Sequence, residues 1–237
     1  MRAELPDTAQ YSTDALFSVG DEQRVMSQTA ADEEVIMFSD YVCPFCYLGK
    51  ASLEQYQDER EEPIEVEWHP FDLRGYKRGP NGEVSNDVED GKDEDYFAQV
   101  RENVERLKEE YDVEMDLDYS MDVDSWNAQQ ASLFVRREHP EEFAEFHDAV
   151  YEALWTEGKD IGDPDVLAQI AAECDVDPDG VREATQDREL EAELEERFES
   201  AQEAGVTGVP TFAYDGQGAR GAVPPTQLRR LIEGAEN

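Results

Sequence analysis

The feature that most constrains the fold is a pair of cysteines, two residues apart, at the junction between a strand and a helix. The apolar run at residues 34–38 predicts a short buried strand, and residues 47–60 have the pattern of a helix. Between them lies the sequence CPFC, Cys43–Cys46, where Pro44 suits a first helical turn because its missing N–H would be unpaired there. Residues 63–68 alternate apolar and polar and predict a second strand. The chain therefore opens with a strand–helix–strand unit that carries CPFC at its first turn.

The remainder of the chain predicts a helical block followed by a return to strands. Residues 74–95 are rich in Gly, Asn and Asp and predict a loop, whereas residues 96–203 show repeated helical stripes of apolar side chains. Strand signals return at 211–214 and 219–223, and residues 225–232 predict a closing helix. A chain that begins βαβ, is interrupted by helices and resumes ββα is predicted to form an α/β, thioredoxin-like fold split by a helical insertion domain.

These patterns divide the chain into four parts. We expect residues 32–95 to form the first part of the thioredoxin-like domain with its connecting loop, residues 96–203 the helical insertion, and residues 204–237 the second part. Residues 1–31 show no sustained periodicity and predict a disordered extension. The first twenty residues lack the apolar core of a secretory signal, and no apolar run is long enough to cross a membrane, so we expect a cytoplasmic protein.

The charge of the chain excludes several classes of partner. Sixty Asp and Glu against twenty Lys and Arg give a formal net charge of −40, and the acids are spread along the whole sequence. Such a surface repels phosphates, so neither nucleic acid nor an anionic membrane is an expected partner. The acids fit either a protein adapted to concentrated salt, where charges are screened within about 3 Å at 1 M, or one that binds a basic partner. Dispersed acids and scarce Lys favour the halophilic interpretation.

The CPFC sequence predicts thiol–disulfide exchange. This chemistry needs a thiolate that attacks and a second thiol close enough to release the mixed disulfide. A helix start would place Cys43 at unpaired N–H groups and the positive end of the helix dipole, which favours its thiolate. One alternative is half of a zinc site, but His69, His139 and His147 lack the spacing of a second ligand pair, so no metal is expected. Another is an inert pair.

A second signal is the sequence GVTGVPTF at residues 205–212. By itself a Val-Pro before a strand is weak evidence, because many X-Pro pairs merely begin an extended segment. In a thioredoxin-like fold it marks the loop that faces the cysteines, with the Val209–Pro210 bond in the cis form. The backbone of Val209 would pair with an extended substrate, and Pro44 and Phe45 would lie at the same substrate-binding surface.

Together these sequences resemble the DsbA family, in particular its FrnE-like branch, over roughly residues 35–233. The resemblance rests on SDYVCPFCYLGK, GVTGVPTF and a late GAVPPTQLRRLIE, and on four features typical of the branch: Asp40, Tyr47–Gly49, Trp68–Phe71 and Asn127–Ala131. Ala128 departs from the threonine usual in the last of these. The resemblance implies dithiol oxidoreductase or disulfide isomerase activity on cysteine-containing proteins or small thiols. It makes Cys43 the nucleophile, Cys46 the resolving thiol and Pro210 the cis-proline, with no cofactor beyond the redox-active cysteines.

The same superfamily includes 2-hydroxychromene-2-carboxylate isomerases and kappa-class glutathione transferases. These relatives usually replace the CxxC by a serine-containing motif that activates glutathione. Both cysteines are present here, which favours dithiol chemistry, but a glutathione-dependent isomerase or transferase, with glutathione as co-substrate, is the alternative. A non-catalytic binding module would require the CxxC to be dispensable.

Three weaker candidates have ordinary structural interpretations. Cys174 falls on the buried stripe of a predicted helix and is expected to act as a small hydrophobic residue. Residues 175–186 begin like a calcium loop, but Gln186 replaces the twelfth-position Glu, and Asp177 fits a helix cap instead. His69 would tune the Cys43 thiolate if its strand ended near the CPFC; otherwise it is a half-buried strand residue.

Overall fold

The computed structural model describes residues 16–18, 34–79, 82–85, 88, 91, 94–119 and 123–234. Its strands are β1 (Leu16–Ser18), β2 (Glu34–Ser39), β3 (Glu65–Pro70), β4 (Thr211–Tyr214) and β5 (Gln217–Arg220). Its helices are α1 (Pro44–Asp58), α2 (Glu94–Tyr111), α3 (Trp126–Glu138), α4 (Phe143–Trp155), α5 (Pro164–Glu173), α6 (Pro178–Ala184), α7 (Arg188–Glu203) and α8 (Pro225–Glu233). Short 3-10 turns lie at Gly75–Lys77 and Leu117–Tyr119.

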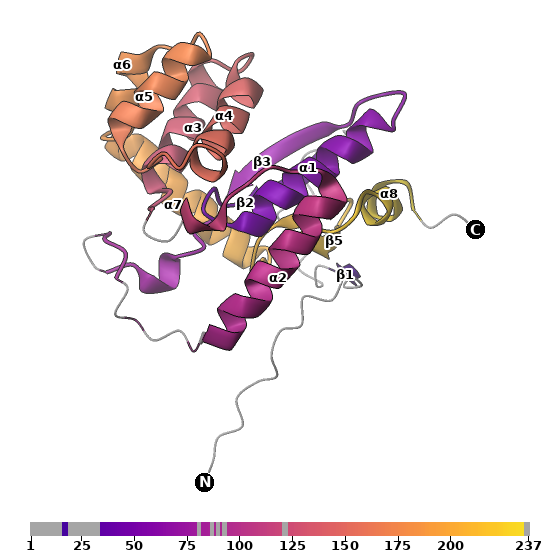
Figure 1. The fold of residues 1–237 in the computed structure, drawn as a ribbon. Helices are drawn as coiled ribbons and strands as arrows, with labels where there is room; N and C mark the ends of the chain where they lie inside the picture. Colours follow the sequence, from indigo (N-terminus) through magenta and orange to yellow (C-terminus); the bar gives the residue numbers. More distant parts are fainter. Residues whose placement is uncertain are drawn as a thin grey trace.

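The strands form one mixed sheet in the order β1-β5-β4-β2-β3 (Figure 1). Strands β2 and β3 run parallel, as the intervening helix requires, and the other pairs are antiparallel. The β4–β5 hairpin turns through Asp215 and Gly216, both with positive φ, which matches the twist of the paired strands. The predicted α/β, thioredoxin-like fold split by helices is confirmed, because helices α2 to α7 lie between β3 and β4 in the chain.

Successive side chains of β2 point to opposite faces of the sheet and join two separate layers of the core. Val35 and Met37 point to the face covered by α1 and α8, where they pack with Phe212 and Leu228. Phe38 points to the opposite face and joins a larger cluster that includes the insertion helices. The end of β2 therefore lies between both layers, and the turn that follows it enters α1.

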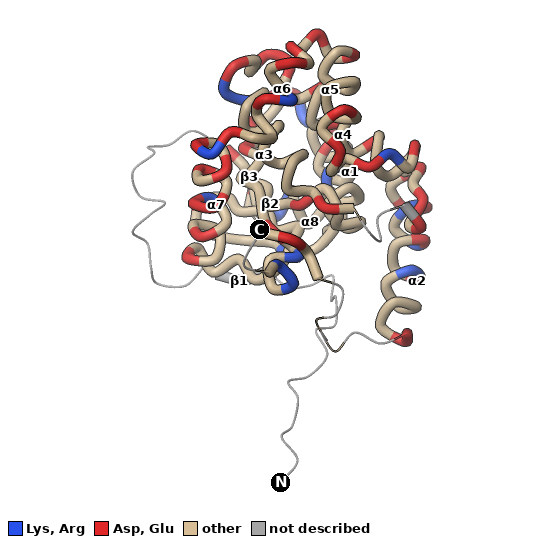
Figure 2. The backbone as a smooth tube through the Cα atoms, turned by 90° about the vertical axis from the view of Figure 1, so that its left-hand side faces the viewer, with Lys and Arg blue, Asp and Glu red and all other residues tan. Residues whose placement is uncertain are grey.

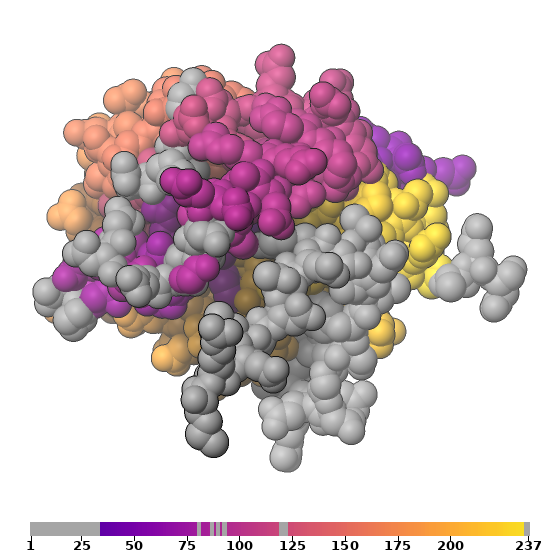
Figure 3. All heavy atoms as spheres, turned by 60° about the horizontal axis from the view of Figure 1, so that its bottom comes forward, coloured from indigo at the N-terminus to yellow at the C-terminus, as the bar shows by residue number. Residues whose placement is uncertain are grey.

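The insertion is not a single block. Helix α2 packs along α1, and the Tyr111 hydroxyl donates to the Ala222 carbonyl at 2.9 Å, whereas α3–α6 cluster apart and α7 crosses β3 (Figure 1). In the space-filling view α2, in magenta, lies between the orange cap helices and the yellow C-terminal segment (Figure 3). The predicted stripe explains this placement, because Val104, Leu107 and Tyr111 are buried while Phe97 at the helix start is 43% exposed. We call α3–α7 the cap.

The predicted disordered extension differs from the structure at three residues. Within residues 1–31, Leu16–Ser18 form β1, which pairs antiparallel with Gln217–Ala219 of β5. The pairing supplies hydrogen-bond partners to the outer edge of β5, which would otherwise be unpaired. The rest of that segment lies outside the described residues.

Acidic residues recur along the helices of the cap and along α2, with fewer basic residues among them (Figure 2). Among the described residues, no helix combines the length and apolar character needed to cross a membrane.

Candidate active site

The CPFC sequence forms the start of α1. Cys43 has an extended backbone and is the residue before the first helical one, Pro44, and the amide of Cys46 donates to the Cys43 carbonyl at 3.0 Å. The proline suits this position because it has no N–H to leave unpaired. The amide of Cys43 donates to the Asp40 carbonyl at 3.1 Å, which closes the tight turn between β2 and α1. The turn therefore places both sulfurs at the helix N-terminus, as predicted.

The two thiols occupy different environments. Cys43 is 3% exposed and its thiol faces the loop before β4, whereas Cys46 is 0% exposed and lies next to Cys43. Burial is the main cause that raises the pKa of Cys46 well above its usual value, and the neighbouring Cys43 side chain adds to the rise. The inner thiol thus holds its proton tightly until an acceptor takes it.

The loop before β4 faces Cys43. The Val209–Pro210 peptide bond is cis, and the Cys43 thiol donates to the Val209 carbonyl at 3.5 Å. Gly49 on α1 makes this approach possible, because a Cβ there would lie 3.0 Å from Pro210 Cγ. The structure therefore brings together the thiols and the predicted cis-proline. Pro44 is half-buried beside them, whereas Phe45 is buried and joins the core cluster.

A buried carboxylate lies beside Cys46. Asp40 is 1% exposed, and its backbone amide donates to the Cys46 sulfur at 3.5 Å. Its carboxylate accepts from the Ser125 hydroxyl at 2.5 Å, the Leu73 amide at 2.9 Å and the Val42 amide at 3.2 Å. Burial raises the pKa of Asp40 to about 6, and these hydrogen bonds oppose the rise. The sequence marked Asp40 only as a family feature; the role of its neighbours was missed.

The cap contributes a second buried network beside the thiols. The Tyr41 hydroxyl bonds to His147 Nδ1 at 2.5 Å and to the Ser132 hydroxyl at 2.6 Å. Burial lowers the pKa of His147 to about 3, which keeps the imidazole neutral. Tyr151 donates to the Ser39 hydroxyl at 3.2 Å, and burial, with a smaller contribution from the nearby cysteines, raises its pKa. Sequence reasoning missed this group, although Tyr151 follows Val150 on a predicted stripe.

Two weaker candidates are located away from these groups. The ring of His69 lies 4.6 Å from that of Phe38, and its nitrogens bond to the Pro70 carbonyl and the Ser200 hydroxyl. Burial lowers the pKa of His69 to about 4. These contacts join β3 to α7 and supply no link to the thiols. Cys174 is buried at the end of α5, as predicted.

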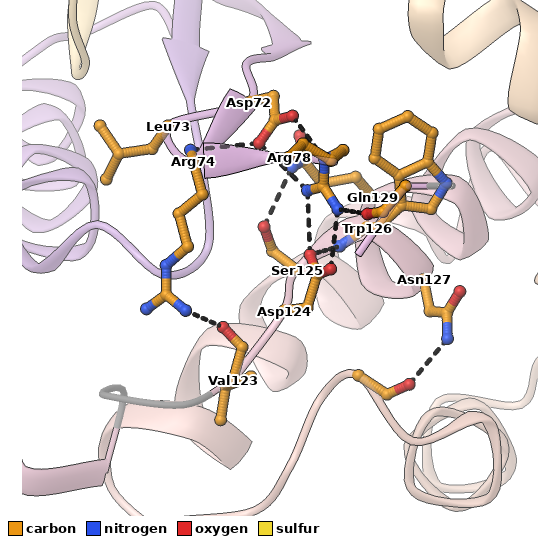
Figure 4. A network of polar contacts seen from close by, with 12 residues as sticks. Asp72, Leu73, Arg74, Arg78, Val123, Asp124, Ser125, Trp126, Asn127 and Gln129 are labelled. Carbon is orange, nitrogen blue, oxygen red and sulfur yellow. Dashed lines mark hydrogen bonds and ion pairs between the residues drawn. The ribbon is translucent and has the colours of Figure 1, made fainter. Parts of the chain in front are cut away.

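Other predicted features have structural roles. Asp163 and Asp177 each cap a helix, accepting from the amide two residues on, and Asp177 thus begins α6 rather than a calcium loop. Asn127 donates to the Gly162 carbonyl at 2.7 Å (Figure 4). Ala128 is fully buried. Within the described part of the chain, no three His, Cys, Asp or Glu side chains converge as a metal ion would need.

The fold and the site define a thioredoxin-like protein with a vicinal CxxC pair, a facing cis-proline and a helical cap. The model of the DSBA-like thioredoxin domain family matches residues 34–233, and the chain belongs to that family.

Similar proteins extend this result. The Bacillus subtilis protein YwbO is 28% identical over 177 residues, which cover 74% of this chain and 84% of YwbO. A probable DsbA oxidoreductase from Streptomyces coelicolor shares the fold with a TM-score of 0.67 at 21% identity, covering 86% of this chain and 91% of that one. A 2-hydroxychromene-2-carboxylate isomerase reaches the same TM-score at 17% identity, covering 84% and 93%. The fold alone is therefore common to both kinds of enzyme.

Proposed function

We propose that the chain is a dithiol–disulfide oxidoreductase or isomerase that acts on cysteine-containing proteins or small thiols through Cys43 and Cys46. One observation carries the proposal: both cysteines lie at the start of α1, with Cys46 fully buried next to Cys43 and the Val209 carbonyl at the Cys43 sulfur. A single activating residue would need no second buried thiol next to it. The arrangement supports attack by one sulfur and release by the other.

The thiol–disulfide exchange proceeds by two successive nucleophilic displacements at sulfur. The Cys43 thiolate attacks a partner disulfide, forming a mixed disulfide and releasing one partner thiolate. Cys46 then attacks the Cys43 sulfur, which forms the Cys43–Cys46 disulfide and releases the second partner thiolate. The partner is reduced by two electrons and the protein is oxidised by two; oxidation of a partner dithiol is the reverse. Val209, with an amide and a carbonyl beside the sulfur, supplies the edge for an extended partner segment.

The second displacement needs a proton acceptor, because the pKa of Cys46 is raised and the sulfur is buried. Asp40 fits this role. Covalent geometry keeps its carboxyl carbon within about 4 Å of its own amide nitrogen, and that amide donates to the Cys46 sulfur. We infer that a single bridging water relays the proton across the remaining gap. With its pKa at about 6, the carboxylate is ionised near neutral pH and accepts the proton as Cys46 attacks.

Several finer assignments belong to the same proposal. The resemblance of the Asp40, Tyr47–Gly49 and Trp68–Phe71 sequences supports a place in the FrnE-like branch. The charge of −40 supports a cytoplasm rich in salt as the working environment and argues against nucleic acid or anionic membranes as partners.

Trapping separates the dithiol mechanism from glutathione-dependent isomerisation. Cys46→Ser should accumulate reductant-sensitive covalent adducts with a cysteine-containing partner, whereas Cys43→Ser should form almost none and lose insulin-reducing activity. Mass spectrometry and non-reducing gels measure both outcomes, and Cys174→Ser is the matched control. If Cys46→Ser traps nothing and retains full activity that depends on added glutathione, the dithiol proposal is wrong.

A further inference from the structure

The Asp40 carboxylate is held by donors from two segments far away in the sequence. The Leu73 amide, 33 residues away, donates to one oxygen at 2.9 Å, and the Ser125 hydroxyl, 85 residues away, donates to the other at 2.5 Å. Leu73 lies in the loop after β3, and Ser125 immediately precedes helix α3 of the cap. The state of this carboxylate therefore depends on how the loop and the cap are held together.

Each donor directly follows an aspartate, and one arginine binds both aspartates (Figure 4). Arg78 Nε and Nη2 donate to the two oxygens of Asp72 at 2.9 and 3.2 Å. Nη1 and Nη2 donate to those of Asp124 at 2.8 and 3.1 Å. The arginine thus joins the residue before Leu73 to the residue before Ser125.

Further contacts restrict the arginine itself. Its guanidinium carbon lies 4.5 Å from the centre of the Trp126 ring, and Nη1 also donates to the Gly82 carbonyl at 2.6 Å. Paired two-pronged contacts between a guanidinium and carboxylates fix orientation as well as distance. The arrangement therefore sets the separation of the loop and the cap at this point.

A glutamine fixes the Ser125 hydroxyl. Gln129 Nε2 donates to the Ser125 oxygen at 3.1 Å, so that the hydroxyl proton is free to point at Asp40. The amide nitrogen also faces the Phe71 carbonyl at 3.4 Å. Among the side chains that the structure describes, Gln129 Oε1 is the buried polar atom without a partner. Leaving a buried acceptor such as Gln129 Oε1 unpaired is unfavourable. The same side chain uses its amide nitrogen to orient the Ser125 hydroxyl toward Asp40.

We propose that Arg78 is a positioning residue: its guanidinium holds in place the two distant hydrogen-bond donors of the Asp40 carboxylate. Through that carboxylate it sets the pH range over which Cys46 releases a mixed disulfide. The inference rests on the proposed dithiol function and adds a residue that touches neither sulfur.

The direction of the effect follows from the groups that face Asp40. In the described structure these are Cys46 on α1, Tyr41 in the same turn and Asp72 in the loop. The hydrogen bonds lower the pKa of Asp40, and the charge of Asp72 raises it. Removing Arg78 loosens the hydrogen bonds to Asp40 and leaves Asp72 without its counter-ion. Both changes favour the protonated form of Asp40. A protonated carboxyl cannot accept the Cys46 proton, so release of the mixed disulfide should require higher pH.

The experiment follows one turnover of the reduced full-length protein with dithiobis-nitrobenzoate. Attack by Cys43 releases one coloured thiol, and attack by Cys46 on the resulting mixed disulfide releases the second. The two phases are recorded by absorbance from pH 5 to 9. In Arg78→Gln the first phase should stay within about twofold of the unsubstituted protein, whereas the midpoint of the second should rise by about one pH unit, a tenfold change in the protonation equilibrium.

The matched control is Arg182→Gln. Arg182 also bridges two aspartates, Asp165 at 2.8 Å and Asp179 at 2.9 Å, but it does so on the outer surface of the cap. Its removal should leave both phases and both pH profiles unchanged. If Arg78→Gln does not fold, Asp124→Asn is the second variant. It leaves the Arg78–Asp72 ion pair in place and removes the charge of the Arg78–Asp124 pair. It should shift the second phase in the same direction by a smaller amount.

The outcomes are distinct. Loss of the first phase in the unsubstituted protein would contradict the proposed function itself. A normal first phase with an unshifted second-phase midpoint in folded Arg78→Gln, or in Asp124→Asn if that variant is needed, would overturn the role of Arg78. An equal shift in Arg182→Gln would do the same, because it would assign the effect to net charge. A uniform slowing at every pH would also overturn it, since a purely structural defect acts in that way.

Discussion

The beginning of α1 and the end of α5 present cysteines in opposite settings. Cys43 and Cys46 lie at a helix N-terminus with each other as neighbours, whereas Cys174 caps the C-terminus of α5. All three are buried, with Cys174 4% exposed. Burial, followed by the charges of nearby carboxylates such as Glu145 and Glu173, raises the pKa of Cys174 to about 11.

Burial alone therefore does not distinguish the thiols proposed to react from a structural one. The helix end does, since N–H groups at the start of a helix favour an anion and carbonyls at its end oppose one. The second difference is a neighbouring sulfur, which Cys46 provides for Cys43. Cys174 has neither feature and acts as a small apolar side chain of the cap.

The largest expected contrast is in alkylation. Near pH 7, iodoacetamide should modify Cys43 first, because burial raises the pKa of both Cys46 and Cys174; for Cys174, a rise of two pKa units corresponds to about a hundredfold less thiolate than at its ordinary value. The rise in the pKa of Cys174 from 9.0 to about 11 is of that size. Peptide mapping by mass spectrometry measures the three rates. Faster modification of Cys46 or Cys174 would remove the distinction between the two regions.

Ionisation of the buried Asp40 carboxyl in the turn before α1 should destabilise the folded protein at neutral pH. Its pKa rises from 3.8 to about 6 on folding, so between these values the folded chain holds a proton that the unfolded chain releases. The stabilisation from this proton is complete below about pH 4 and is lost as pH rises through 6, about 3 kcal/mol in all.

Urea unfolding of the unsubstituted protein and of Asp40→Asn, from pH 4 to 7.5, isolates this effect. The difference in free energy of unfolding between the two should change by about 3 kcal/mol in favour of Asp40→Asn as pH rises. A constant difference would mean that Asp40 keeps its ordinary pKa in the folded protein.

The end of α5 should tolerate loss of the Cys174 sulfur. Cys174→Ala should reduce the free energy of unfolding by about 1 kcal/mol, the small-cavity end of the usual range, and leave turnover intact. Cys174→Ser should cost more, since its hydroxyl needs a partner in the core. Chemical denaturation and insulin reduction measure both quantities. Loss of turnover in a folded Cys174→Ala protein would make this thiol part of the reaction.

The smallest effect concerns the acidic surface that both regions share. Between about 0.2 and 3 M KCl the thermal midpoint should rise by several degrees, because ions screen the repulsion among excess carboxylates. Alkylation of Cys174, which lies among carboxylates, should accelerate more than that of Cys43. Calorimetry and the same mapping experiment test these outcomes, and a flat or falling midpoint would count against the halophilic interpretation.

Local sequence patterns determined the elements that carry the thiols. The CPFC at a strand–helix junction, β4 at Thr211–Tyr214 and the split α/β order all follow from short-range periodicity and turn chemistry, and the structure confirms them. The cis-proline at Pro210 was implied by the family resemblance and is found. Boundaries shifted by a few residues, as at β3, which begins at Glu65 rather than at residue 63.

Tertiary structure decided what surrounds those thiols. Sequence periodicity shows which face of a helix is apolar but not which distant segment it meets. It therefore could not assign α2 to α1, give His69 its Ser200 partner, or bring Ser125 to Asp40 across 85 residues. The hydrogen bonds of a buried carboxylate depend on where separately folded segments dock, and here Arg78 joins two of them. The sequence by itself thus determined the position of Cys43, Cys46 and Asp40, while docking of the loop and the cap determined which distant donors bind the Asp40 carboxylate.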